Sequence, residues 1–140
     1  MSIEVNNISK SYGAQKALDN ISFSIKKGEI VGFLGPNGAG KSTLMKILTT
    51  YLSADEGTAL VNAQDVNSNP KAVQLSIGYL PEHNPLYLDL YVREYLAFNA
   101  DVYNVDKSRI EEVIQLTGLS TESHKKIAEL SKGYRQRVGL

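Results

Sequence analysis

The sequence contains no cysteine and carries no net charge, and both absences restrict what the chain can be. Without cysteine it forms neither a disulfide framework nor a thiolate metal site, which suits a reducing compartment. Fifteen basic and fifteen acidic residues balance to zero, which argues against broad electrostatic binding to nucleic acid. The 140 residues are enough for one domain with its own core.

Long apolar runs are missing as well. No segment approaches the roughly 18 to 20 apolar residues that cross a bilayer. The first residues, Met1–Glu4, lack the basic and apolar regions of a signal peptide. No internal repeat or low-complexity tract is present. We therefore expect any membrane role to depend on a partner protein.

A glycine-rich loop is the most informative feature that is present. It fits the pattern G-x-x-x-x-G-K-[S/T] of phosphate-binding loops. Its glycines let backbone N–H groups approach a phosphate without a Cβ in the way. Lys41 supplies a positive charge for the outer phosphates, and the Ser42 hydroxyl can ligate Mg²⁺. We predict that the chain binds ATP or a related nucleoside triphosphate with Mg²⁺. The predicted phosphate-binding residues are Gly35, Pro36, Asn37, Gly38, Ala39, Gly40, Lys41, Ser42 and Thr43.

The two flanks of this loop predict an α/β fold. Before it, Ile30–Leu34 is an unbroken apolar run, typical of a parallel strand that is buried on both faces. After it, apolar residues recur at helical spacing and predict a helix with one buried stripe. The stripe consists of Leu44, Ile47, Leu48, Tyr51 and Leu52. Other apolar segments predict strands at 3–8, 21–25, 58–61 and 77–80, with a polar loop at 65–70.

Helical periodicity dominates after about residue 82. The spacing of apolar residues predicts helices over 92–103 and 110–117. Ser108 with Glu111 predicts a capping box, and Gly118 predicts a helix end. We predict a nucleotide-binding core over residues 1–82, a helical subdomain over 83–131 and the start of a further helix over 132–140.

Several segments, in this order, resemble the ATP-binding subunits of ABC transporters. Ser11–Asp19 resembles the adenine-contacting A-loop region, and Ile77–Glu82 resembles the strand that enters the Q-loop. Val92–Leu96 resembles the first helix of the helical subdomain, and Leu130–Val138 resembles the signature motif. The likeness spans the whole chain and is nearest to bacterial multidrug, polysaccharide or gliding-motility exporters. It implies a P-loop NTPase core of the ABC type, with N-terminal antiparallel strands and a helical subdomain.

The resemblance also implies roles for residues outside the loop. Tyr12 would stack on adenine, although it could instead pack on a strand edge. Ser131 and Gly133 would contact the γ-phosphate held by the other subunit of an ATP-sandwiched dimer, or they could be an ordinary helix start. Glu82 stands where the family has glutamine; it would be an oxygen ligand of Mg²⁺, or a solvated loop acid.

Five further positions depart from the family pattern or invite other interpretations. Lys132 and Tyr134 replace a glycine and a glutamine of the usual signature. Tyr91 replaces a threonine, so we expect the following helix to lack a side-chain cap at its start. His83 and His124 have no second ligand at a useful spacing, so we expect both to be surface or subdomain residues.

Some parts of such an ATPase are not found after the signature. The family continues to a Walker B aspartate, a catalytic glutamate, a D-loop and a switch histidine, and hydrolysis needs such groups. We assign no catalytic residue, and we expect the sequence to be the N-terminal part of an ATPase. Its phosphate-loop strand would then expose backbone groups and apolar faces. We expect a chain that is marginally stable or aggregates.

The resulting functional hypothesis is ATP binding by an ABC subunit. When intact, that subunit would couple ATP hydrolysis to transport through a membrane permease, as a cytoplasmic protein peripheral to the inner membrane. Asn84–Leu88 would lie near the groove that receives the permease, or would pack within the helical subdomain. The alternatives are a nucleotide-binding fragment without turnover, a soluble ABC ATPase of translation or DNA repair, and a small-molecule kinase. We predict no nucleic-acid partner.

Overall fold

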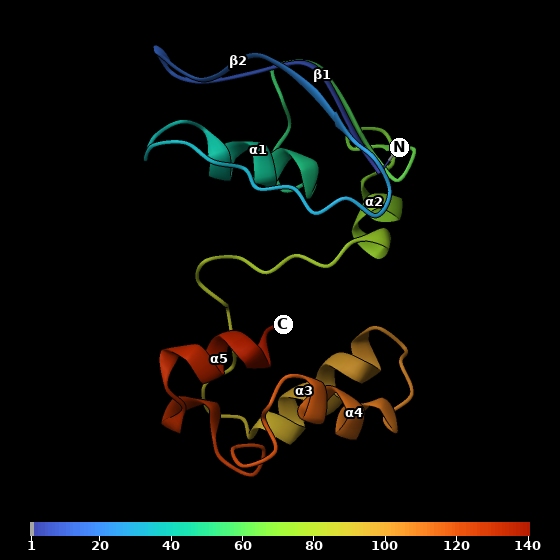
Figure 1. Ribbon diagram of the computed structural model, residues 1–140, viewed down its shortest axis with the longest axis vertical. Helices are drawn as coiled ribbons and strands as arrows, with labels where there is room; N and C mark the ends of the chain where they lie inside the picture. The colour runs from blue at the N-terminus through green and yellow to red at the C-terminus, as the bar shows by residue number, and fades with distance from the viewer. Residues whose placement is uncertain (1) are drawn as a thin grey trace. The chain divides into compact units, whose positions relative to one another are not determined.

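The computed structural model describes residues 2–140, which divide into two compact units, the first ending at Tyr79 and the second beginning at Leu80. The first unit contains the strands and two helices, and the second unit is helical (Figure 1). This division lies close to the predicted boundary after residue 82, whose functional meaning stays a prediction. Among residues 2–140, no helix is both long and apolar enough to cross a membrane.

Four antiparallel strands form the sheet of the first unit. They are β1 (Ile3–Tyr12), β2 (Gln15–Ile25), β3 (Glu56–Val61) and β4 (Gln64–Asp65), in the order β2-β1-β3-β4. β1 and β2 form a long hairpin in which Ile3 lies opposite Ile25 and Tyr12 lies opposite Gln15. Along β2 the half-buried Phe23 alternates with exposed serines, so the predicted one-sided strand is confirmed.

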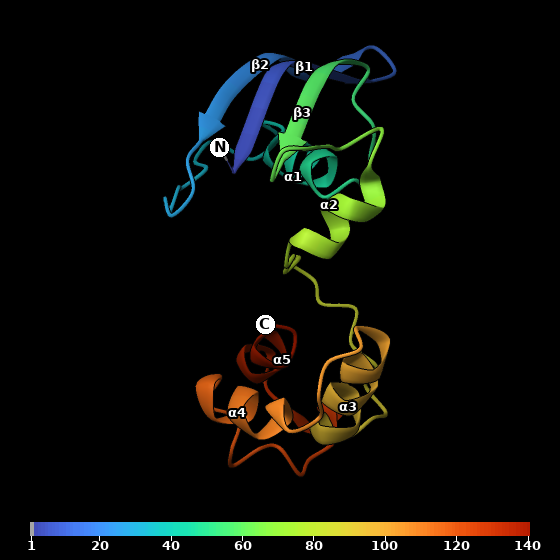
Figure 2. The ribbon, with the colours of Figure 1, turned by 90° about the vertical axis from the view of Figure 1, so that its right-hand side faces the viewer.

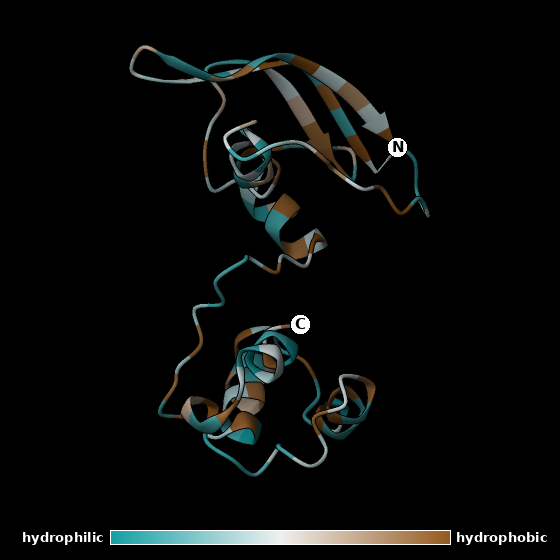
Figure 3. Ribbon diagram, turned by 60° about the vertical axis from the view of Figure 1, so that its left-hand side comes forward, coloured by the Kyte–Doolittle hydropathy of each residue, from teal (hydrophilic) through white to brown (hydrophobic). Residues whose placement is uncertain are grey.

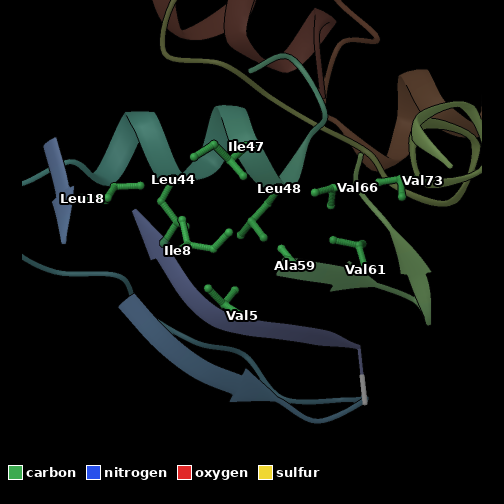
Figure 4. Close-up of a cluster of buried hydrophobic side chains, with 10 residues drawn as sticks. All are labelled: Val5, Ile8, Leu18, Leu44, Ile47, Leu48, Ala59, Val61, Val66 and Val73. Carbon is green, nitrogen blue, oxygen red and sulfur yellow. The ribbon is translucent and has the colours of Figure 1, made fainter. Parts of the chain in front are cut away.

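Helix α1 (Lys41–Leu48) covers one face of this sheet, as Figure 2 shows. Its apolar stripe meets the inward side chains of β1 and β3 in a cluster drawn in Figure 4. Tyr51 was predicted to continue the stripe, but it is 81% exposed. The reason is that the helix ends before Tyr51, at Leu48, and Thr50 adopts a left-handed φ of 64°. The buried residues of this core are Val5, Ile8, Leu18, Leu44, Ile47, Leu48, Ala59, Val61, Val66 and Val73.

Two predicted strands are not formed. The two segments are Ile30–Leu34 and Ile77–Leu80. Neither forms a strand, and neither belongs to the β2-β1-β3-β4 sheet. A strand needs a neighbour for its backbone hydrogen bonds, and apolar composition alone does not supply one. Ile30 and Leu34 are almost fully exposed, whereas Phe33 packs its ring 6.1 Å from that of Phe23.

The predicted polar loop at 65–70 is confirmed between its two end residues, as a turn at 66–68 followed by Asn69. Asp65 ends β4, and helix α2 spans Pro70–Ser76. Asp65 organises the turn between them: its Oδ1 accepts hydrogen bonds from the Asn67 and Ser68 N–H groups at 2.9 and 2.8 Å and from the Ser68 hydroxyl at 3.0 Å. The polar residues here build a turn and start a helix with Pro70 in its first turn.

The second unit contains α3 (Val92–Val102), α4 (Arg109–Leu116), a 3₁₀ turn η1 (Ile127–Glu129) and α5 (Lys132–Val138). Both predicted helices of this region are therefore confirmed. Before α3, the backbone pairs with the segment before η1: Val92 N–H donates to Lys125 O, and Ile127 N–H donates to Leu90 O. The core residues of this unit are Val92, Ile114, Leu119, Ile127, Leu130 and Val138.

The helix ends follow the sequence only in part. The Ser108 side chain forms no cap, because Ser108 is itself helical and its N–H donates to Asp106 Oδ1 at 2.8 Å. The predicted Ser108–Glu111 capping box is therefore wrong. Gly118 does end α4: its φ is +65°, and the following Leu119 N–H donates to Ile114 O as in a Schellman motif.

Side-chain polarity follows the buried and exposed faces of the elements. Figure 3 shows alternating hydrophobic and hydrophilic bands along the strands, as expected for strands with one covered face. In α4 the buried Ile114 and half-buried Ile110 share a side, while Glu111 and Glu112 are exposed. Glu111 forms an ion pair with Arg93 of α3, which lowers the pKa of that carboxyl group. The amphipathic pattern thus fixes which face of each element is buried.

Asp65 provides a pH-dependent test of the turn before α2. The Ser68 and Asn67 N–H groups lower the pKa of Asp65 below its ordinary value of 3.8. A lowered folded-state pKa contributes stability above pH 3.8, and this contribution is lost as the pH falls through the folded-state pKa. We expect Asp65→Ala to cost about 1–3 kcal/mol of unfolding free energy at neutral pH.

Asp65→Asn is the matched control, because its carbonyl oxygen keeps an acceptor for the same N–H groups but does not titrate. Urea unfolding at a series of pH values measures both variants. The difference between wild type and Asp65→Asn should shrink below pH 3.8. A difference that is constant with pH would show that the charge of Asp65 does not stabilise the turn.

The exposed segment 30–34 provides a second test. Ile8 is fully buried, whereas Ile30 is fully exposed. Ile8→Ala should therefore cost about 2–5 kcal/mol, and Ile30→Ala should change the free energy of unfolding by no more than about 0.5 kcal/mol. Ile30→Ala should also reduce aggregation, since it removes exposed apolar surface. Chemical unfolding and static light scattering measure the two effects; an Ile30→Ala cost as large as that of Ile8→Ala would contradict the exposure.

Candidate nucleotide-binding site

The glycine-rich loop leads directly into the first turn of α1. Residues 37–40 form a turn, and α1 begins at Lys41, so its first turn follows the loop without a break. Gly38 and Gly40 adopt left-handed φ values of 85° and 80°, which favour glycine. The first N–H groups of a helix have no partner within it, and they attract an anion. The loop and the helix start therefore present donors on one exposed surface.

Gly40 holds the loop against β2. A Cβ at position 40 would lie 2.3 Å from the Ala17 carbonyl oxygen and 2.7 Å from a methyl carbon of Leu18. Leu18 is part of the buried core, so the strand cannot yield without disturbing the packing. Glycine is thus required at this position by two independent constraints, the backbone angle and the contact. Glycine thereby allows the end of the loop to lie directly against the strand.

Lys41 folds back onto the loop that precedes it. Its Nζ donates to the Gly35 carbonyl oxygen at 2.6 Å and to the Pro36 carbonyl oxygen at 2.7 Å. Ala39 N–H also donates to Pro36 O, at 3.3 Å, which closes the turn. The ammonium group is therefore held at the loop by two carbonyls. An arriving phosphate oxygen would meet this cation at the same place as the helix start.

The predicted Mg²⁺ ligands belong to different units. Ser42 is exposed in the first turn of α1, while Glu82 is exposed in the second unit. Residues 2–140 contain no cluster of three or more His, Asp or Glu side chains that could hold a metal by itself. Mg²⁺ in nucleotide sites usually takes one or two protein oxygens besides water and phosphate. The exposed Ser42 hydroxyl fits that requirement.

Tyr12 lies at the end of the β1–β2 hairpin and is 51% exposed. It pairs with Gln15, and two residues further along β2 comes Ala17, whose carbonyl touches the loop at Gly40. Strand β2 therefore contacts both Tyr12, through Gln15, and the loop, through Ala17. Between them, Lys16 pairs with Asp19 at 2.5 Å, and this hydrogen bond raises the pKa of Lys16. Because Tyr12 is half exposed, a base in solution can reach its side chain.

Ser131 and Gly133 are in the second unit. Ser131 is the N-cap of α5, because its Oγ accepts from the Tyr134 N–H at 3.4 Å. Gly133 is exposed, and a Cβ there would meet no atom within 4 Å, so the local fold does not require glycine. The space above it is open. The candidate residues thus form two sets, one in each unit.

Arg135 was not predicted to have a role, yet it orders the segment before Ser131. Its Nε donates to Ile127 O at 3.1 Å, and its Nη2 donates to Ala128 O at 2.6 Å. The N–H groups of the same two residues donate to Leu90 O and Leu88 O. Peptide groups 127 and 128 are therefore held from both sides. No sequence signal separates this arginine from an ordinary exposed helix residue.

Other expectations for the second unit agree with the structure. His83 and His124 are both exposed, as predicted. Tyr91 provides no side-chain cap for α3, and instead its N–H donates to Glu94 at 3.0 Å. Tyr134, which replaces the usual glutamine, is half-buried against the core. The centre of its ring lies 5.0 Å from the Arg137 Cζ. Its ring is therefore used in packing.

Comparison with known proteins identifies the family. The family model for the ABC transporter matches residues 18–140. The chain is 34% identical over 139 residues to the bacitracin transport ATP-binding protein BcrA of Bacillus licheniformis. This match covers 99% of the present chain and 45% of BcrA. The chain is also 37% identical over 144 residues to a probable sulfate/thiosulfate import ATP-binding protein, CysA, of Chlorella vulgaris, covering 100% of this chain and 61% of that protein.

Solved structures agree with this result. The structure of an ATP-binding subunit of an ABC transporter superposes with a TM-score of 0.86 at 29% identity, covering 99% of this chain and 60% of that one. CbiO1 from Clostridium perfringens is described as part of the ABC transporter complex cbiONQ. It superposes with a TM-score of 0.84 at 26% identity, covering 99% of this chain and 59% of that one. The chain spans about half to three fifths of the lengths of these relatives.

These likenesses confirm the predicted fold class, the P-loop NTPase fold of ABC ATPase domains, with N-terminal antiparallel strands and helices. They include relatives named for import and relatives named for resistance or antibiotic transport. The chain therefore belongs to the ABC transporter family, among its ATP-binding components.

Proposed function

We propose that this chain binds ATP with Mg²⁺ through Tyr12 and the loop Gly35–Thr43. The observation that carries the proposal is the geometry of the loop: it is fixed on β2 at Gly40, runs into the start of α1 and holds the Lys41 ammonium beside it. Cation, helix start and exposed hydroxyl together suit a triphosphate. Family membership supports the choice of ATP.

Each residue has a distinct part in this proposal. The Tyr12 ring stacks on the base, which fits its half-exposed place on the hairpin. Lys41 leaves the Gly35 and Pro36 carbonyls and pairs with the outer phosphates. The Ser42 hydroxyl ligates Mg²⁺, and the bound ion would neutralise part of the phosphate charge. The N–H groups of the loop and of the first turn of α1 complete the cradle.

We further propose that the second unit completes the site in an ATP-sandwiched dimer. Ser131 and Gly133 of one subunit would face the γ-phosphate bound to the other, and Glu82 would contribute an oxygen to Mg²⁺. Exposed Ser131 and the open space at Gly133 support this role. Arg135 supports it indirectly, since it holds the segment that leads to Ser131.

The whole subunit would couple ATP hydrolysis to transport through a membrane permease, at the cytoplasmic side of the inner membrane. The names of the relatives support a transport role, for bacitracin in one case and for sulfate or thiosulfate in another. Segment Asn84–Leu88 is proposed to meet the permease; Tyr87 and Leu88 are exposed there.

Lys41→Ala tests ATP binding directly. Removal of the ammonium should weaken Mg·ATP binding about tenfold or more, since hydrogen bonds to charged groups are worth about 1.5–3 kcal/mol. Lys46→Ala is the matched control, because Lys46 lies on the same helix near Tyr51 and away from the loop. Titration calorimetry measures both. Equal affinities of wild type and Lys41→Ala would refute the proposed site.

Phosphate release from the same samples tests turnover by the 140 residues. We expect no release above the Lys41→Ala background, because no catalytic carboxylate has been assigned to this chain. Steady release that depends on Lys41 would show that such a group lies within it. Binding without release would fit a nucleotide-binding module.

A pair of glycine substitutions tests how the loop is fixed. Gly38→Ala and Gly40→Ala both place alanine at a left-handed φ, which costs about 1–2 kcal/mol. Only Gly40→Ala also brings a Cβ against the Ala17 carbonyl; at Gly38 no atom lies within 4 Å. We expect Gly40→Ala to lower both the melting temperature and ATP affinity more than Gly38→Ala does. Equal effects in thermal melts and titrations would argue against the contact between loop and strand.

A further inference from the structure

Asn37–Gly38 is the one Asn-Gly dipeptide in the sequence, and it lies in the middle of the candidate loop. Asparagine is thermolabile because the backbone nitrogen of the next residue can attack its side-chain amide carbon. A following glycine favours this attack, since it has no side chain to obstruct the nitrogen and it restricts the backbone least. The loop thus contains a chemically reactive pair where phosphate is expected to bind.

The structure leaves this pair open to reaction. Asn37 and Gly38 are both exposed, and they lie in a turn outside helix and strand. A Cβ at Gly38 would meet no atom within 4 Å. Among residues 2–140, the Gly38 N–H finds no backbone acceptor. The side of Gly38 where a side chain would lie is therefore open, and its nitrogen is not held by a backbone hydrogen bond.

Asn67–Ser68 is a comparable pair that the fold protects. It also combines an exposed asparagine with a small next residue. Here, however, the Ser68 N–H donates to Asp65 Oδ1 at 2.8 Å, and the Asn67 N–H donates to the same oxygen at 2.9 Å. The attacking nitrogen at 68 is thus held in the turn before α2. The two pairs provide a contrast within one chain.

We propose that Asn37 is a site of spontaneous deamidation in the nucleotide-free loop, that the change abolishes ATP binding, and that bound ATP prevents it. The Gly38 nitrogen forms a bond to the Asn37 side-chain carbonyl carbon, the bond from that carbon to the amide nitrogen breaks, and ammonia leaves with the Gly38 N–H proton. Water then adds to one of the two ring carbonyls of the succinimide and opens it to aspartate or isoaspartate.

The new carboxylate would act on the neighbouring cation. Lys41 Nζ already binds Pro36 O at 2.7 Å, one residue from Asn37. A carboxylate at position 37 would compete for this ammonium and repel the phosphates of ATP. Isoaspartate would also lengthen the backbone of a loop that is fixed at Gly40. Bound phosphates would oppose the reaction, because they would occupy the N–H groups of the loop. This consequence rests on the proposed function.

The test is ageing of the full chain in mildly alkaline buffer, with and without Mg·ATP. At intervals, the tryptic peptides that contain Asn37 and Asn67 are separated and their masses are measured by mass spectrometry. Mg·ATP binding is titrated on the same samples. We expect conversion at Asn37 to be several-fold faster than at Asn67 and to be slowed by Mg·ATP. The fraction of chains that bind ATP should fall in proportion to unmodified Asn37.

Asn37→Ala is the variant that cannot react, and each variant is compared only with its own fresh sample. Its binding should not decline on ageing, whereas Asn67→Ala should decline as wild type does. Conversion at Asn37 no faster than at Asn67, or full binding by converted chains, would overturn the proposal. Failure of the fresh chain to bind Mg·ATP would overturn the proposed function instead, and the masses would still decide whether Asn37 reacts.

Discussion

The close approach of Gly40 to the backbone of β2 is the contact on which the candidate site depends. The loop before α1 has few packed side chains of its own, so its position is set where it meets Ala17 and Leu18. Leu18 in turn belongs to the core that holds α1 on the sheet. A single glycine therefore connects the packing of the first unit to the geometry that a phosphate would encounter.

The sequence predicted those parts of the fold that depend on local patterns. Apolar spacing predicted the strand segments 3–8 and 21–25 and the helices α1, α3 and α4, although the two strands extend further, to Tyr12 and back to Gln15. Gly118 ends α4 as glycine commonly does. Ile30–Leu34 and Ile77–Leu80 failed for a different reason: their apolar composition suits a buried strand, but pairing depends on a neighbouring strand. Around Asp65, the polar residues form the predicted loop as a turn, and Pro70 at its end begins a helix.

The candidate site was predictable to the extent that it is one continuous motif. Lys41 and its loop could be assigned from spacing, because glycine, lysine and hydroxyl each have a physical part there. The carbonyls that hold Lys41, the Ala17 contact and the role of Arg135 could not, since they depend on residues brought together by folding. Arg135 in particular secures Ile127 and Ala128 from a helix that follows them in the chain.

The two hydrogen bonds from Lys41 to Gly35 and Pro36 also bear on how a ligand would enter. The ammonium group is held by two hydrogen bonds to the loop, and these restrict the rotamers of the Lys41 side chain before any anion arrives. Binding would exchange two carbonyl partners for phosphate oxygens within the same small volume. The entropic cost of ordering the lysine is thereby part of the free energy of folding. The loop is closer to a preorganised site than to one that closes around its ligand.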